Sequence, residues 1–123
     1  MYQVSVERHF DAAHFLRGYQ GKCEALHGHR FRVVVRVWSS RVDDTGMAYD
    51  FTALKKHLDD ILAKYDHTCL NEVPPFDKEN PSSENIAVTI YDELKPKLTG
   101  APVSLSCVEV WESPESGVAY RPD

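Results

Sequence analysis

The stretch from Cys23 to His29 carries the side chains of a metal site. Its sequence, CEALHGH, places a thiol four residues ahead of two histidines that a single glycine separates. If a strand begins at His27, then His27 and His29 point to one face, because side chains alternate along a strand. Thiolates and imidazoles are both ligands of zinc. The stretch therefore predicts either a site that includes Cys23 or an imidazole-bound metal beside a free thiol.

A third imidazole is available from His14, at the end of the segment FDAAH. A hairpin between the first two predicted strands would bring His14 close to His27 and His29. Three neutral imidazoles suit Zn²⁺ and leave one position open for water or substrate, which indicates catalysis rather than scaffolding. Imidazole also suits copper and nickel, and zinc is the metal that we expect. We assign no role to His9 or His57.

Cys23 has two interpretations. It can be a fourth ligand, which would make a closed structural site with three histidines and one cysteine. It can instead stay free, in which case a nearby cation lowers the pKa of the thiol and the thiolate acts as a base or nucleophile. A cysteine base needs a histidine that a carboxylate orients, and the segment YDHTCLN supplies Asp66 and His67. Cys69 and Cys107 are predicted to be structural.

Composition indicates one ordinary globular domain over residues 1–123, with 42% hydrophobic and 27% charged residues. The net charge of −5 argues against a nucleic-acid-binding protein. No apolar run is long enough for a transmembrane helix, and the first residues do not resemble a signal peptide, so we expect a cytoplasmic protein without membrane contacts. Three widely spaced cysteines do not indicate a disulfide framework.

The elements that must position these residues follow from the hydrophobic pattern. Alternation predicts strands over residues 2–10, 29–38, 103–112 and 117–121, with a short strand at 47–50. Helical spacing of apolar residues predicts helices over residues 51–65, capped by Asp50, and about 84–95, capped by Ser82 or Ser83.

This order predicts an α+β fold, a four-stranded antiparallel sheet with both helices on one face. The other face carries Trp38 and the arginines of residues 30–36, and is neither fully apolar nor fully polar. That face and two exposed sheet edges predict that copies of the chain join their sheets.

Four segments in this order, FDAAH, CEALHGH, YDHTCLN and NPSSENIA, resemble the 6-pyruvoyl-tetrahydropterin synthase family over nearly the whole chain. The resemblance is greatest to its bacterial branch, the 6-carboxy-tetrahydropterin synthases of queuosine (7-deazaguanine) biosynthesis. The family's tunnelling fold implies trimeric barrels that stack into a hexamer, with active sites between subunits.

The resemblance implies a role for each matching residue. His14, His27 and His29 match zinc ligands, Cys23 the catalytic cysteine, and Asp66 and His67 the pair that works with it. Glu112 matches the glutamate that anchors the pterin ring, with Glu109 a rival on the opposite strand face. Ser82 and Ser83 match hydroxyl residues that touch the pterin. Arg30, Arg32 and Arg36 would line the barrel, which leaves Arg17 and Lys22 as candidates for binding a triphosphate.

The implied substrate is 7,8-dihydroneopterin triphosphate. In the carboxy branch the products are 6-carboxy-5,6,7,8-tetrahydropterin, acetaldehyde and triphosphate. In the pyruvoyl branch only triphosphate is eliminated, and the residues named above do not separate the two. A non-catalytic zinc-binding module with a closed site is the alternative from another class.

Overall fold

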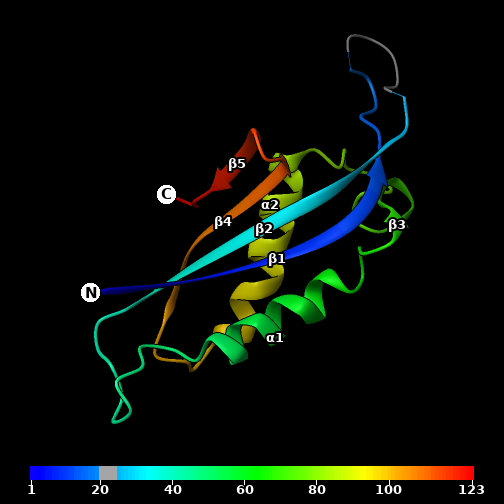
Figure 1. Cartoon of the computed structure of the whole chain (residues 1–123). Helices are drawn as coiled ribbons and strands as arrows, with labels where there is room; N and C mark the ends of the chain where they lie inside the picture. Colours follow the sequence, from blue (N-terminus) through cyan, green and yellow to red (C-terminus); the bar gives the residue numbers. More distant parts are fainter. Residues whose placement is uncertain (20–24) are drawn as a thin grey trace.

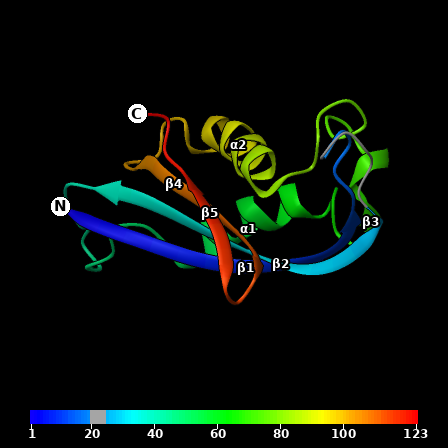
Figure 2. The same ribbon diagram turned by 90° about the horizontal axis from the view of Figure 1, so that it is seen from above.

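The computed structural model describes residues 1–19 and 25–123. Two long strands, β1 (Tyr2–His14) and β2 (His27–Ser39), cross the molecule as one hairpin (Figure 1). The strands β4 (Ser104–Ser113) and β5 (Ser116–Tyr120) form a second hairpin beside β2. The helices α1 (Phe51–Leu62) and α2 (Ser83–Leu94) cover one face of the sheet (Figure 2). The α+β class is confirmed.

In the described part of the chain the sheet has five strands rather than the predicted four, in the order β3-β1-β2-β4-β5. The additional strand, β3 (Thr68–Cys69), pairs in parallel with Ala12 and Ala13 of β1, so the sheet is mixed rather than antiparallel. Two residues are too short to show alternation, and their pairing depends on where the end of α1 delivers the chain. The prediction of four antiparallel strands was therefore wrong at this edge.

The prediction of a short strand at residues 47–50 was also wrong, because this segment pairs with no strand in the described part of the chain. Asp50 instead caps α1, and its side chain accepts a hydrogen bond of 2.8 Å from the amide of Thr52. The helix ends at Leu62, three residues before the predicted end, but Tyr65 still packs in the core. Ser82 is the cap of α2. Short 3₁₀ helices follow β3 (Leu70–Glu72) and α2 (Lys95–Leu98).

The core lies between the sheet and the two helices. Alternate residues of β2 face it, and Phe31 of β2 stacks on Phe10 of β1 with ring centroids 4.9 Å apart. The helices contribute the apolar stripes that helical spacing predicted, including Leu54, Leu58 and Ile61 from α1 and Ile86, Ile90 and Leu94 from α2. Neither helix has the length and apolarity needed to cross a membrane.

Candidate metal centre

Three histidines meet where β1 ends and β2 begins, at the end of the hairpin that the connecting loop closes, on the face that carries the core. The register places His14 opposite His27 and Ala12 opposite His29. His14 shares its face with Phe10, and His29 shares its face with Phe31, because residues two apart on a strand point the same way. The ring centroids lie 4.7 Å apart for His14 and His27, and 4.6 Å apart for His27 and His29. The hairpin thus brings together the three residues that the sequence singled out.

Backbone carbonyls fix the orientation of two of these rings. The Nδ1 atom of His14 lies 2.8 Å from the carbonyl oxygen of Pro81, and that of His27 lies 2.8 Å from the carbonyl oxygen of Ala25. A carbonyl oxygen only accepts hydrogen bonds, so each Nδ1 carries a proton, and in the neutral imidazole Nε2 then keeps its lone pair. This is how histidines that bind a metal through Nε2 are usually oriented.

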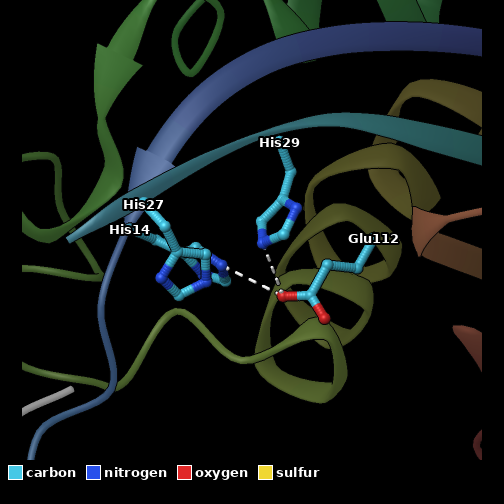
Figure 3. A group of neighbouring side chains, drawn as sticks. All are labelled: His14, His27, His29 and Glu112. Carbon is cyan, nitrogen blue, oxygen red and sulfur yellow. Dashed lines mark ion pairs between the residues drawn. The ribbon is translucent and has the colours of Figure 1, made fainter. Parts of the chain in front are cut away.

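Glu112, at the end of β4, completes the group. Its Oε1 atom lies 3.1 Å from Nε2 of His14 and 3.2 Å from Nε2 of His29 (Figure 3). One donor atom from each of these four residues lies within 4.8 Å of the others. His14 is buried, and within the described residues its Nε2 atom makes no hydrogen bond. Three imidazoles and a carboxylate are a donor set that zinc accepts, so the group could hold a metal.

The two glutamates of β4 are divided between the two faces of the sheet, as strand parity predicted. Glu109 lies on the face away from the histidines, where it accepts hydrogen bonds of 2.7 Å from Arg36 and 2.9 Å from Trp111. Burial alone would raise the pKa of the Glu109 carboxyl, but these hydrogen bonds and the charge of Arg36 outweigh burial and lower it. Glu109 is therefore held by an ion pair, and Glu112 is the glutamate at the histidine group.

Asp66 and His67 form a separate group with Asp11, just before β3. Asp66 accepts a hydrogen bond of 2.9 Å from the Asp11 amide, and this bond lowers the pKa of its carboxyl. The second carboxylate oxygen lies 3.0 Å from Nδ1 of His67. His67 has a left-handed backbone, with φ of 60°, and its amide donates a hydrogen bond of 2.6 Å to the Asp11 carbonyl. Asp66 thus contacts His67, but the structure does not place the pair among the four residues of the histidine group.

Ser82 and Ser83 begin α2 directly after Pro81, the residue whose carbonyl contacts His14. The Ser82 hydroxyl accepts a hydrogen bond of 3.1 Å from the Asn85 amide as the helix cap. The start of α2 therefore lies beside the histidine group. Cys23 and Lys22 lie outside the described residues.

Arg17, a candidate for binding a triphosphate, has its guanidinium group hydrogen-bonded to the backbone. Its guanidinium donates hydrogen bonds to the carbonyl oxygens of Asn71, Phe76 and Glu79, at 3.2, 2.9 and 3.2 Å. These bonds fasten the chain that leaves β1 to the segment before α2. We infer a structural role for Arg17.

Two asparagines that sequence reasoning missed hold the same part of the chain. The amide of Asn71 bonds both the N–H and the carbonyl of Phe15, each at 3.0 Å. The amide of Asn80 bonds the N–H and the carbonyl of Arg17, at 2.8 and 2.9 Å. Both asparagines belong to the segments YDHTCLN and NPSSENIA, but their spacing gave no sign of these partners.

The comparisons with known proteins agree with this geometry. A sequence model of the family described as 6-pyruvoyl tetrahydropterin synthase matches residues 3–123. The 6-carboxy-5,6,7,8-tetrahydropterin synthase of Synechocystis sp. is 41% identical, over 98% of this chain and 93% of the relative. A dihydroneopterin monophosphate aldolase of Pyrococcus furiosus is 37% identical, over 89% of this chain and 88% of the relative.

The fold matches solved structures as well. The structure of Caenorhabditis elegans 6-pyruvoyl tetrahydropterin synthase superposes with a TM-score of 0.80 at 29% identity, and the match covers 100% of this chain and 98% of that one. The histidine group thus lies in a chain that matches this family from end to end in sequence and in fold. The chain belongs to the 6-pyruvoyl tetrahydropterin synthase family.

Proposed function

We propose that this protein is a zinc-dependent lyase of queuosine (7-deazaguanine) biosynthesis. It converts 7,8-dihydroneopterin triphosphate and one water to 6-carboxy-5,6,7,8-tetrahydropterin, acetaldehyde and triphosphate. The observation that carries the proposal is the buried Nε2 atom of His14, which makes no hydrogen bond within the described residues and faces the other donors of the group. Similarity to the Synechocystis synthase supports the choice of reaction.

In this proposal His14, His27 and His29 hold the zinc. When bound, zinc supplies a Lewis acid that makes the hydroxyl-bearing carbons of the substrate side chain more acidic. The Cys23 thiolate removes the carbon-bound proton, and His67, oriented by Asp66, passes protons on. Glu112 accepts hydrogen bonds from the N–H groups of the pterin, and Ser82 and Ser83 contact its ring at the start of α2.

We also propose that the single domain works in a hexamer of two stacked trimers, with sheets joined into barrels. Two features of the sheet support this assembly. The strand β5 is one edge of the sheet. Among the described residues, β3 pairs with β1 only at Ala12 and Ala13, which leaves most of β1 as a second edge. The separation of the Asp66–His67 pair from the histidine group in one chain also favours a site that several copies complete.

The test is a product assay on the zinc-loaded protein with 7,8-dihydroneopterin triphosphate. We expect acetaldehyde, detected through coupled NADH oxidation, in equal amount with 6-carboxytetrahydropterin identified by mass spectrometry. Triphosphate without acetaldehyde would favour the second candidate, a 6-pyruvoyl tetrahydropterin synthase activity, to which the likeness to the Caenorhabditis elegans structure points. Dihydroneopterin monophosphate serves as a parallel substrate, and its turnover in preference to the triphosphate would contradict the proposal.

Cys23→Ala separates the enzyme from a non-catalytic zinc-binding module. The proposal expects the variant to lose turnover and to keep its zinc, measured by atomic absorption after gel filtration. Loss of zinc from Cys23→Ala, together with no turnover by the wild-type protein, would favour the module with a closed site.

A further inference from the structure

The face of the sheet away from the helices (Figure 2) carries a cavity of about 300 Å³. It is lined by His9 of β1, Arg30 and Arg32 of β2, and Trp111, Ser113 and Pro114 from the end of β4 and the turn after it. Arg30 directly follows His29 in β2, and neighbouring residues of a strand point to opposite faces of the sheet. The backbone of the sheet therefore separates this cavity from the histidine group.

Arg32 is held at one side of the cavity by the ring of Trp111. Its guanidinium carbon, Cζ, lies 4.9 Å from the centroid of the ring, which is within the range of a cation–π interaction. The ring packs on the backbone of β5, because a Cβ atom added at Gly117 would collide with it. Its indole N–H donates a hydrogen bond of 2.9 Å to Glu109. The ring and the guanidinium that lies on it thus keep a defined orientation.

The polar side chains of the cavity have N–H and O–H groups left to donate. Arg32 has five guanidinium N–H groups, and in the described part of the chain it donates one of them, to Glu7 at 3.2 Å. Arg30 makes no hydrogen bond or ion pair with any described residue. The hydroxyl oxygen of Ser113 accepts a hydrogen bond of 3.2 Å from the Glu115 amide, so its O–H hydrogen is available to another acceptor. The cavity therefore lacks acceptors rather than donors.

No carboxylate is found among the residues that line the cavity. Asp11 lies opposite Arg30 in the strand pairing, but it forms no ion pair with Arg30 in the described part of the chain. A carboxylate oxygen of Asp11 instead lies within 4.8 Å of donor atoms of Asp66 and His67. In a chain with a net charge of −5, the cavity thus gathers positive charge without a matching acid, which favours an anion as its occupant.

We propose that this cavity binds an oxyanion of the phosphate class, either free inorganic phosphate or the phosphate group of a larger molecule. The planar fork of a guanidinium matches the oxygens of a phosphate and can donate two parallel hydrogen bonds to it. Arg32 supplies such a fork in a fixed orientation, while Arg30 and the Ser113 hydroxyl supply further donors. Protonated His9 would add a third positive charge. The inference does not depend on the reaction proposed above, because the cavity and the histidine group lie on opposite faces of the sheet.

The test is isothermal titration calorimetry of the zinc-loaded protein with sodium phosphate, at constant ionic strength because exposed charges attract anions in dilute salt. We expect one phosphate per chain, with a Kd of about 1 mM or lower. Arg30→Gln should weaken binding by about 10-fold or more, because it removes charge-assisted hydrogen bonds. Phosphate that binds at the metal would still bind this variant. Since Arg30 has no partner among the described residues, the variant should fold like the wild type, which circular dichroism checks.

Arg41→Gln is the matched control, because it removes the same charge from an exposed side chain outside the cavity, and it should bind phosphate like the wild type. Adenosine 5′-monophosphate distinguishes the two sources of the anion. Binding tighter than that of phosphate supports the phosphate group of a larger molecule, and equal or weaker binding supports the free ion. Acetate at the same ionic strength should not compete, because it offers one charge and two oxygens.

Three results would each overturn the proposal. They are absence of phosphate binding at about 10 mM, equal phosphate affinity of the wild type and Arg30→Gln, and displacement of phosphate by an equal concentration of acetate. None of them bears on the proposed lyase reaction, which the product assay measures separately. Conversely, a protein that releases no acetaldehyde can still bind phosphate in this cavity, so the two proposals fail independently.

Discussion

Asn71→Ala tests whether the chain leaving β1 is held by the asparagine amides. Asn71 is buried, and its side chain makes two hydrogen bonds of 3.0 Å with the backbone of Phe15. Alanine removes both bonds and leaves an N–H and a carbonyl of Phe15 without these partners. Each such loss costs about 1 to 1.5 kcal/mol when the stranded group is partly buried. We therefore expect the free energy of unfolding to fall by about 2 to 3 kcal/mol, a change of about 30- to 150-fold in the folding equilibrium.

The assay is urea unfolding followed by circular dichroism, at one fixed protein concentration because assembly would couple to stability. Asn80→Ala removes the equivalent pair of bonds to Arg17, at 2.8 and 2.9 Å, and should cost a similar amount. Glu79→Ala is the matched control, since its exposed side chain is lost while its carbonyl bond to Arg17 is kept, and its effect should stay within about 0.5 kcal/mol. If Asn71→Ala unfolds at the same urea concentration as Glu79→Ala, the reasoning on the amide bonds is refuted.

Three further predictions concern an ion pair, the dependence of stability on pH, and the metal. Arg36→Met should lower the free energy of unfolding, measured with urea, by about 2 kcal/mol, because it leaves the mostly buried Glu109 carboxylate without its ion-pair partner. Adding Glu109→Gln should restore part of this loss, and no recovery would contradict the reasoning. The folded-state pKa of Asp66 is lowered, so its contribution to stability is present above its ordinary pKa of about 3.9 and is lost as the pH falls through the lower folded value. In a plot of the urea midpoint against pH, Asp66→Asn should then reduce the fall of the midpoint at acidic pH. An unchanged fall would argue against the hydrogen bond from the Asp11 amide as its cause. A chelator should abolish turnover and leave the far-ultraviolet circular dichroism of the protein unchanged, because the hairpin and its core do not depend on the metal; unfolding on chelation would indicate a structural site.

Much of the fold could be predicted because apolar and polar residues alternate regularly along the long strands. The pattern of residues 29–38 puts Phe31, Val33, Val35 and Val37 on one face, and all four are fully buried in the structure. The same parity placed His14, His27 and His29 together once the hairpin was assumed. It also put Glu109 and Glu112 on opposite faces, which the structure confirms through the Arg36 ion pair and the His14 contact.

The remaining features depend on contacts between distant segments. The strand Thr68–Cys69 has no pattern of its own, and it exists because β1 offers its edge at Ala12 and Ala13. Arg17 resembled a free cation in the sequence, and only folding brings the carbonyls of Asn71, Phe76 and Glu79 around it. The family resemblance implied a pterin contact for Glu112 and gave no sign that its carboxylate lies between two histidines.

The residues of the histidine group are separated by very different lengths of chain. His14 and His27 face each other across one hairpin, whereas Glu112 arrives on β4, after both helices. Contacts that are local in sequence form early in folding, and distant contacts form later because a longer loop must close first. During synthesis the three imidazoles therefore emerge well before the carboxylate. The docking of the last hairpin, which brings Glu112 beside His14 and His29, is the step that completes the group of four residues.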